Sequence, residues 1–485
     1  MRNAHAALAL VSLSTFLVFS VSAEGDFNSI PDKQIINAKA QIQREKLPEL
    51  TATSADSISA QDISNQQLQQ NFALTEKLLN QAIIQNQSAA IADLLTIYQQ
   101  FPQQDPILVR FAQAKLAKAQ GDYEQAIALF EQILAIEPKL NPIRIELAIA
   151  LLQDQQNKAA AAQFAKAQQA ADLPADIKNL LTLYQQILQQ RESWQFDFGL
   201  NYVRSHNVNN VSNQEFIEQT GFKKGEEMLP QKAQGLAFSA NLSRSYNFYG
   251  HHYWQFENAS YGKIYWDNHS FDDMSNRSYL GYAHKTAHSQ SQFLPFYERQ
   301  WYGGHRYKWA QGLRLAHSHW LNPQIQLSLA LEYSKNRYFT HSNLNGHSQL
   351  LSSTLLWTPT DNRYFWLGAD FGREHTNQRH YSYDLKTVRI GWGENWPWFE
   401  LASRFSFSYS QRQYRDNLRL GNVLQFDRAR KDQIFALNTS LWKRDWQLFG
   451  ITPKLNFQWK KQRSNFPSLY SYHDQQIYVL FEKSF

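Results

Sequence analysis

The sequence predicts an α-helical N-terminal region followed by a 14-stranded antiparallel transmembrane β-barrel, which is an α plus membrane-β fold class. The composition changes near residue 192, because all 14 tryptophans lie from Trp194 onward and the preceding region is rich in Ala, Gln and Leu. Beyond the N-terminal segment, no stretch approaches the roughly 20 apolar residues that a membrane helix needs. The C-terminal region instead alternates apolar and polar residues with a period of two, which is typical of strands.

The N-terminus is typical of an exported protein. Residues 1–23 form a signal peptide pattern, with Arg2 before an apolar core and small residues Val21 and Ala23 before the expected cleavage site. An uncleaved membrane anchor is the alternative, but its flanks are weak. The chain has no cysteine, which excludes disulfides, thiol chemistry and a lipid anchor on the chain itself. Residues 24–70 are polar and predict a flexible or partly helical leader.

Residues 71–190 predict a tetratricopeptide-like domain of short amphipathic helices. The segment "GDYEQAIALFEQILAIEP" has the spacing of the second helix of such a repeat, carried by Gly121, Tyr123, Ala126, Phe130 and Pro138. Neighbouring segments repeat the pattern in weaker form. The expected helices are 71–86, 89–101, 106–119, 123–136, 142–154, 157–170 and 174–190.

The functional prediction for these helices concerns the surface that they form together. Repeat helices cannot bury their apolar faces alone, so they stack and leave a concave surface suited to a peptide or protein. A place in the repeat core is the simpler interpretation for most of the large apolar residues, which include Phe111, Phe130 and Leu147. The candidate binding residues on this surface are Arg110, Phe111, Lys115 and Lys118.

Residues 194–485 predict the barrel. In "PQIQLSLALEYS", Ile325 and alternate residues after it are apolar, while Gln324 and its alternates are mostly polar. No helix or second sheet remains in the sequence to cover the apolar faces, whereas lipid outside and water inside satisfy both faces. The expected strands are 194–203, 235–246, 254–265, 278–286, 292–302, 308–320, 324–337, 347–358, 363–375, 381–393, 398–412, 431–443, 450–463 and 475–485.

The connections between strands predict the orientation of the barrel. Those after odd strands are mostly long, including 204–234 and 413–430, and those after even strands are short, such as 359–362. Long outside loops and short periplasmic turns are the usual asymmetry, so the helical domain is expected in the periplasm and the barrel in the cell outer membrane. Tryptophans near strand ends are expected to form interfacial girdles: Trp320, Trp357, Trp392, Trp396, Trp398 and Trp442.

The last strand carries a further signal. A terminal strand that ends in Phe, with apolar residues at alternate positions before it, has the form read by the barrel-assembly machinery. Lys483 departs from the usual apolar residue at the third place from the end. The residues expected to form this signal are Ile477, Val479, Phe481 and Phe485.

The sequence offers little that suggests an enzyme. It has no phosphate-binding glycine loop, no G-x-S-x-G elbow and no H-E-x-x-H motif, so we expect no catalytic residue and no cofactor. The pairs His251–His252 and His317–His319 could suggest metal, but no third ligand is recognisable, and interfacial histidines are the better interpretation. The net charge of +6 is spread along the chain, which argues against nucleic acid.

Charged residues on the polar faces of strands are expected to line the barrel lumen. Most should neutralise one another, and a minority should shape passage through the barrel. The residues singled out for the lumen are Arg314, Glu332, Arg404, Lys454 and Lys460.

The chain is similar to the surface lipoprotein assembly modulator (Slam) family. The resemblance rests on "YSYDLK", "SLWKRDWQLFGITPKL" and the ending "RSNFPSLYSYHDQQIYVLFEKSF", together with a signal peptide, a short helical domain and a 14-stranded barrel. It implies a translocator for surface lipoproteins, often of the iron- or heme-acquisition type, or for a soluble heme-binding protein. The helices would capture cargo, which would then pass through the lumen or a lateral opening between the first and last strands. The implied partners are this cargo, the barrel-assembly machinery and outer-membrane lipid.

Two other functions remain open at this stage. Helical repeats joined to a barrel also occur in exopolysaccharide exporters, although a lumen for polysaccharide should carry charge of one sign. A plain porin is the second alternative, but it leaves the helical domain without a purpose.

Overall fold

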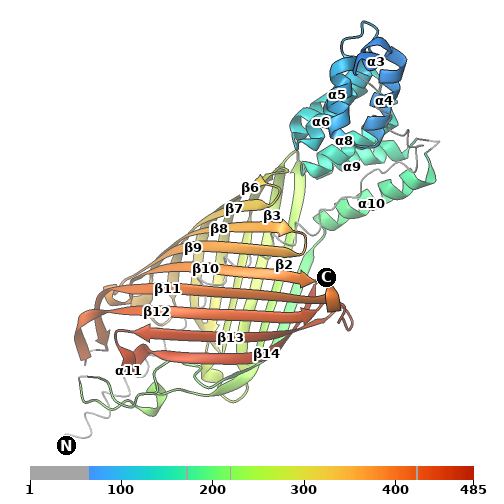
Figure 1. Cartoon of the computed structure of the whole chain (residues 1–485). Coiled ribbons are helices and arrows are strands. Elements are labelled where there is room, and N and C mark those ends of the chain that lie inside the picture. Colours follow the sequence, from blue (N-terminus) through green and yellow to red (C-terminus); the bar gives the residue numbers. More distant parts are fainter. Residues whose placement is uncertain (1–64, 171–172, 219, 422–423, 485) are drawn as a thin grey trace, which may run out of the picture.

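The computed structural model describes residues 65–170, 173–218, 220–421 and 424–484 (Figure 1). The predicted signal peptide and leader, apart from residues 65–70, lie outside the described residues, as does Phe485. A helical domain stands at one end of a long barrel, and the chain passes from one to the other between helix α10 and strand β1.

The helices of the N-terminal domain begin and end within a few residues of the predicted positions. Helix α3 lies within the predicted leader, for which partial helix was expected. None of the described helices is long and apolar enough to cross a membrane. The helices are α3 (Asn65–Gln70), α4 (Phe72–Ile84), α5 (Ser88–Tyr98), α6 (Pro106–Ala119), α7 (Tyr123–Ile136), α8 (Asn141–Gln153), α9 (Asn157–Gln168) and α10 (Ala175–Glu192).

The turns inside the helix pairs α4–α5, α6–α7 and α8–α9 share one backbone feature. Each contains a residue with positive φ: Asn86 at 54°, Gly121 at 82° and Gln155 at 61°. A residue in this left-handed conformation ends a helix and reverses the chain, so the pairs repeat with the same geometry. Phe130 and Phe164 are fully buried between the pairs. The helical domain therefore has the stacked arrangement that the repeat spacing predicts.

The second region is a closed antiparallel barrel in which β1 pairs with both β2 and β14. Its fourteen strands confirm the predicted number. They are β1 (Gln195–Ser205), β2 (Ala233–Tyr249), β3 (His252–Tyr265), β4 (Asp273–Lys285), β5 (Ser289–Tyr302), β6 (His305–Asn322), β7 (Ile325–Tyr338), β8 (Gly346–Thr360), β9 (Arg363–Thr376), β10 (Tyr383–Trp396), β11 (Leu401–Leu420), β12 (Leu424–Lys443), β13 (Thr452–Ser464) and β14 (Tyr472–Ser484). A short helix, α11 (Pro467–Tyr470), lies in the β13–β14 connection.

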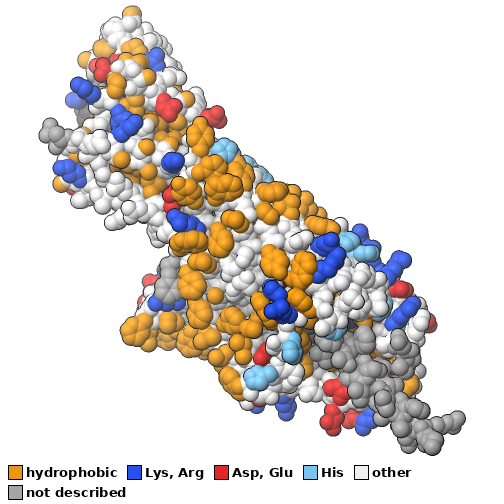
Figure 2. Space-filling model, turned by 180° about the vertical axis from the view of Figure 1, so that it is seen from behind, with side chains coloured by type: hydrophobic (Ala, Val, Ile, Leu, Met, Phe, Trp, Pro, Cys, Tyr) orange, Lys and Arg blue, Asp and Glu red, His pale blue; other side chains and the backbone are white. Residues whose placement is uncertain are grey.

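Side chains alternate between the two faces of the barrel wall. On β7, Leu329, Leu331 and Tyr333 are exposed on the outer face, while Glu332 and Ser334 are shielded on the inner face. Figure 2 shows apolar side chains over much of the outer wall, with Lys, Arg and His gathered towards the end away from the helical domain. An apolar outside and a polar inside are the arrangement that a lipid bilayer requires of a barrel.

Two sequence-based expectations about the barrel are wrong. The predicted loop 413–430 is mostly strand, because β11 and β12 pair with each other up to Leu420 and Leu424, beyond the ends of their neighbours. Of the tryptophans expected in the girdles, Trp320 packs against Leu356 and its inward-facing neighbours. Trp442 lies 4.8 Å from the ammonium of Lys454 on the inner face. Their place near strand ends did not reveal which face they occupy.

Strand β1 is paired over different lengths at its two edges. Towards β2, residues 195–205 pair with 233–243, so the ladder covers the whole strand. Towards β14, the ladder covers only residues 197–201, which pair with 480–484. Strand β14 is itself paired with β13 along residues 472–482. The β1–β14 seam is therefore closed by backbone pairing along only part of its length.

Candidate functional site

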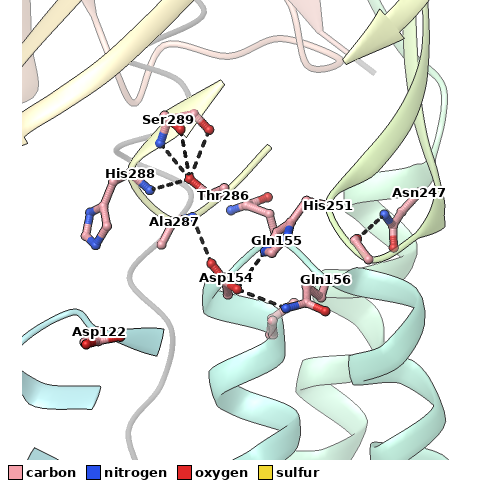
Figure 3. Close-up of polar contacts among 12 residues, drawn as sticks. Asp122, Asp154, Gln155, Gln156, Asn247, His251, Thr286, Ala287, His288 and Ser289 are labelled. Carbon is pink, nitrogen blue, oxygen red and sulfur yellow. Dashed lines mark hydrogen bonds and ion pairs between the residues drawn. The ribbon is translucent and has the colours of Figure 1, made fainter. Parts of the chain in front are cut away.

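The helical domain docks onto the barrel through a carboxylate at the α8–α9 turn (Figure 3). Asp154 Oδ2 lies 2.7 Å from His251 Nε2, at the β2–β3 turn. Asp154 Oδ1 accepts a hydrogen bond of 3.3 Å from the Ala287 amide, at the β4–β5 turn, and Gln156 donates to Oδ2 at 3.0 Å. One side chain thus ties the helical domain to two barrel turns. We call this end of the barrel the docked end and the opposite end the loop end.

Backbone atoms of the same repeat turns complete the docking. The Gly121 carbonyl lies 2.9 Å from His288 Nε2, and the Gln155 carbonyl accepts from the Tyr253 hydroxyl. The amide of Lys158 donates to Asn247 Oδ1 at 2.8 Å. Two of the positive-φ residues therefore carry the contacts, because the left-handed turn points their carbonyls away from the helices and towards the barrel.

The charge of Asp154 is part of this docking. Burial of the carboxyl would raise its pKa, but the hydrogen bonds from His251, Gln156 and the Ala287 amide hold the pKa below its ordinary value. The carboxylate is thus ionised at neutral pH. Sequence reasoning missed this role, because Asp154 and His251 lie 97 residues apart in the chain, a separation that no local pattern encodes.

The four candidate binding residues of the repeats lie together on α6, but they differ in what they contact. Lys115 and Lys118 hold Glu146 of α8 at 2.9 and 2.8 Å, with side chains 8% and 18% exposed. Burial would raise the pKa of Glu146, but the two ammonium groups keep it below its usual value. The Phe111 ring packs against the Phe130 ring in a tilted arrangement, with ring centroids 6.2 Å apart. Arg110 is half-buried and reaches the Pro106 carbonyl at 3.4 Å.

Charged residues on the inner wall of the barrel form buried networks. Glu332 binds Arg277 at 3.0 Å and lies 3.6 Å from Arg314, so these two inner-face residues of the predicted set belong to one network. Arg277 also pairs with Glu298, which lies 3.2 Å from Lys308. Each of these side chains is almost fully shielded from solvent. Charges packed this way hold strands of the wall together, because removing one partner leaves a buried charge.

The remaining predicted lumen residues lie on the inner face but in other places. Arg404 is half-buried opposite Ser440 of β12. Lys454 pairs with Glu482 of β14, and Lys460 lies 5.5 Å from the ring centre of Tyr472. The structure does not bring these three residues together with Arg314 and Glu332 in a single cluster, because they stand on different strands of the wall.

The predicted assembly signal lies on the outer face of the last strand. Ile477 is 73% exposed, Val479 41% and Phe481 49%, and all three point away from the lumen. The fourth member, Phe485, lies outside the described residues. At the docked end, Ser484 Oγ donates to Asp197 Oδ1 at 2.6 Å, which joins β14 to β1.

A second set of contacts crosses the β1–β14 seam at the loop end, and sequence reasoning missed it. Lys224, in the β1–β2 connection, donates to the carbonyls of Ser212 at 2.9 Å and Ser468 at 2.7 Å. The Ser212 amide donates to the Leu469 carbonyl at 3.2 Å, and the Glu218 amide to Ser468 Oγ at 3.1 Å. We call these five residues the clasp. Burial lowers the pKa of Lys224 to about 8.

The clasp has an apolar base. Ile217 and Met228 of the β1–β2 connection pack against Leu418, at the tip of β11, and against Leu469 of α11. The strand order places β11 to β14 on one side of the seam and β1 and β2 on the other. The cluster therefore spans the seam at the loop end, where the β1–β14 ladder is absent.

The histidine pairs have other partners in the structure. His251 contacts Asp154, and His252 Nδ1 lies 2.5 Å from the Tyr282 hydroxyl. His317 contacts Ser291 Oγ at 2.9 Å, and its ring lies 6.4 Å from that of His319 on the outer face. Within the described ranges, no group of three His, Cys, Asp or Glu side chains has the arrangement of a metal site.

Comparison with known proteins gives the family of both regions. The family model described as "Surface lipoprotein assembly modifier" matches residues 194–485, and the model described as "Surface lipoprotein assembly modifier, N-terminal TPR repeats" matches residues 61–164. A surface lipoprotein assembly modifier of Pasteurella multocida is 32% identical over 94% of this chain and 92% of its own length. A hemophilin secretion modulator of Acinetobacter baumannii is 25% identical over 92% of this chain and 93% of its own.

Solved structures add less. OccAB4 of Acinetobacter baumannii aligns with 61% of this chain and 100% of its own at a TM-score of 0.30 and 8% identity, which is too weak to carry an argument. The family match confirms the expected outer-membrane location, with an N-terminal helical repeat domain, and the expectation of a transport protein that is not an enzyme. With a family model over most of the chain and relatives above 30% identity along nearly its whole length, the chain belongs to the surface lipoprotein assembly modifier family.

Proposed function

We propose that this protein moves a lipoprotein from the periplasm across the outer membrane to the cell surface. The single observation that carries this proposal is the family match along nearly the full chain, since relatives of matched length bear the name surface lipoprotein assembly modifier. A cargo of the iron- or heme-acquisition class is the part of the proposal that rests on the family resemblance alone.

The helical domain would capture the cargo and hold it at the barrel entrance. Its docking through Asp154 and the repeat turns supports this role, because a receiving surface must stay fixed beside the route. Within the candidate set, Arg110 is the best suited to contact cargo without disturbing the fold. Lys115 and Lys118 also neutralise buried Glu146, so a change there would alter packing as well as binding.

The barrel would pass the cargo, and the lumen residues would shape that passage. Lys454 and Lys460 are half-buried on the inner face near the β1–β14 seam, where a moving polypeptide could reach them. The assembly role proposed for Ile477, Val479, Phe481 and Phe485 is separate from transport. It concerns the barrel-assembly machinery, which would read this strand once, during insertion.

Surface delivery of a lipoprotein encoded beside the gene tests the proposal. The two proteins would be co-expressed in a host lacking both, and intact cells would be treated with protease. We expect cargo to become accessible only with the full-length protein, and less cargo with Arg110→Glu. Lys77→Glu is the matched control, since Lys77 is exposed on α4 with no contact in the described structure, and it should deliver normally.

A soluble cargo is the second candidate, favoured by the hemophilin secretion modulator of Acinetobacter baumannii among the relatives. The same cells distinguish the two, because a soluble cargo would appear in the medium and a lipoprotein would stay attached to the cell. Cargo that stays protected in both assays, with the protein correctly inserted, would contradict translocation. That result would return the polysaccharide exporter to consideration.

A further inference from the structure

We propose that the cargo leaves the barrel sideways, through the β1–β14 seam, and that residues 475–479 of β14 bind it as an added strand. This inference rests on the proposed function and names its exit. The occupant is an extended segment of the polypeptide in transit. Both edges of the exit and the contacts that close it are defined by the described residues.

The first argument is the unequal pairing of the strands that border the seam. Residues 475–479 pair with β13 on one side, but the described structure pairs no residue of β1 with them. The opposing stretch of β1, residues 202–205, pairs only with β2. A strand edge of this kind offers backbone donors and acceptors to another extended chain, which is the basis of strand addition.

The second argument is that a backbone carbonyl of β1 near this edge already accepts a hydrogen bond from a side chain of β1 itself. Asn201 Nδ2 donates to the Tyr202 carbonyl at 3.1 Å, at the point where the β1–β14 ladder stops. A side chain that bonds its neighbouring backbone competes with ladder formation. The ladder therefore ends at a residue whose local bonding favours the break, rather than at the end of a strand.

The third argument is that the stretch without pairs is bounded at both ends by contacts that can open. At the docked end, the short ladder 197–201 with 480–484 is joined by the Ser484–Asp197 hydrogen bond. At the loop end, the clasp joins the β1–β2 connection to α11 by neutral backbone and hydroxyl acceptors. The contact between Ser484 and Asp197 and the contacts of the clasp are hydrogen bonds and not ion pairs between two charged side chains.

The fourth argument is the contrast with the opposite wall. There, Arg389 binds Asp370 at 2.6 Å, and the side chains are 3% and 7% exposed. Opening that wall would separate buried charges, which costs several kcal/mol. Opening the β1–β14 seam would separate the few hydrogen bonds of the short ladder and of the clasp, each of which contributes about 1 kcal/mol, and would part the apolar base of the clasp. The seam between β1 and β14 therefore opens without separating a buried ion pair such as that of Arg389 and Asp370.

The outer lips of the seam suit a lipidated cargo. Leu200 and Tyr202 on β1 and Ile477 and Val479 on β14 all point outward into the bilayer. A polypeptide pairing with β14 would therefore hold an attached acyl chain beside lipid. Moving an acyl chain from water into lipid gains about 0.8 kcal/mol per CH₂, so this exit avoids drawing the chain through a polar lumen.

A single engineered disulfide tests the exit, because the natural chain has no cysteine. Asn201→Cys with Leu480→Cys would lock the seam, since the two residues are direct partners in the ladder. Asn201→Cys with Ala237→Cys is the matched control, which shares one position and locks β1 to β2 instead. We expect the oxidised seam variant to lose protease-accessible cargo, reductant to restore it, and the control to deliver in both states.

The outcomes separate the exit from the function. Delivery by the oxidised seam variant at the level of the control would overturn the lateral exit while leaving translocation intact. Should Leu480→Cys impair insertion, Leu200→Cys with Phe481→Cys and its control Leu200→Cys with Phe238→Cys repeat the test on the outer face. Translocation itself would be in doubt only if the reduced variants and the unmodified protein also failed to deliver.

Cross-linking tests the added strand directly. A photo-reactive residue at Ile477 of β14, which is 73% exposed, should cross-link to cargo arrested in transit. The same residue at Leu331 of β7, which is 54% exposed on the outer face, is the matched control and should not. Equal cross-linking at both positions, or none at Ile477 while cargo is arrested in the barrel, would contradict the proposal.

Discussion

On its β2 edge strand β1 is paired along residues 195–205, whereas on its β14 edge the pairing is confined to residues 197–201. The helical domain docks on the firmly paired side, at the β2–β3 and β4–β5 turns. The clasp, by contrast, spans the weakly paired side at the loop end. The barrel therefore has a fully paired side that supports the helical domain and a seam that is held by few and separable contacts.

The largest expected effect lies in the barrel wall opposite the seam, where strands β9 and β10 are joined by the ion pair between Asp370 and Arg389. Asp370→Ala should leave Arg389 buried beside the hydroxyl groups that remain, and should lower the free energy of unfolding by about 3–5 kcal/mol. Urea titration of the barrel in liposomes, followed by tryptophan fluorescence, would measure it. Asp427→Ala is the control, because Asp427 is exposed on β12 with no contact in the described structure. A loss for Asp370→Ala as small as the control's would refute the contrast between wall and seam.

A smaller effect concerns the clasp and its dependence on pH. The pKa of Lys224 is about 8 when the clasp is closed, below the ordinary value of 10.5. Between these two values the open state binds a proton that the closed state does not, so closing becomes more favourable as the pH rises. We expect a gain of about 1–2 kcal/mol between pH 8 and 10.5.

Hydrogen exchange of the Ser212 amide, corrected for its intrinsic rate, would report the opening of the clasp. Lys224→Met keeps a side chain of similar length without the titrating group, and its clasp should show no such dependence on pH. Faster exchange of the Ser212 amide as the pH rises, after correction for the intrinsic rate, would contradict the prediction that burial of Lys224 lowers its pKa.

The third effect lies on the docked side. Asp154→Asn keeps one oxygen acceptor but loses the charge, and should weaken docking by about 1 kcal/mol, seen as faster exchange of the Ala287 amide. In the natural protein this contribution should be lost as the pH falls through the lowered pKa of Asp154. Asp93→Asn, at an exposed residue of α5, is the control. If the Ala287 amide exchanged at the same rate in Asp154→Asn, the charge of Asp154 would not contribute to docking, and the backbone contacts would account for it.

The smallest effect is expected at the seam itself. Ser484→Ala removes the hydrogen bond to Asp197 in an exposed position and should cost about 0.5 kcal/mol of global stability. Because the ladder there is short, we expect residues 197–201 to open locally more often, while the free energy of global unfolding falls only slightly. Exchange of the amides of residues 197–201 would separate the two quantities. A change in global stability comparable to that of Asp370→Ala would show that the seam is not weak.

Much of this fold follows from local sequence patterns, and the seam and the docking do not. Alternation predicts fourteen strands, and the repeat spacing predicts helix bounds such as 106–119 and 123–136, because both signals lie within short windows. The prediction of a loop at residues 413–430 was wrong, because the polar residues of this segment continue the two strands beyond the apolar belt. The ladder between β1 and β14, and the contact between Asp154 and His251, join residues far apart in the chain.

The paired extension of β11 and β12 has a consequence outside the membrane. Each strand has 20 residues, and their outer parts pair only with each other, beyond the ends of β10 and β13. Arg419, Asp427 and Arg428 are exposed on this extension. An antibody or a bacteriophage that approaches the cell meets this hairpin as an ordered protrusion. We therefore expect immune and phage selection to act on its exposed residues, which can vary without altering the barrel, and not on Leu418, which packs in the apolar base of the clasp.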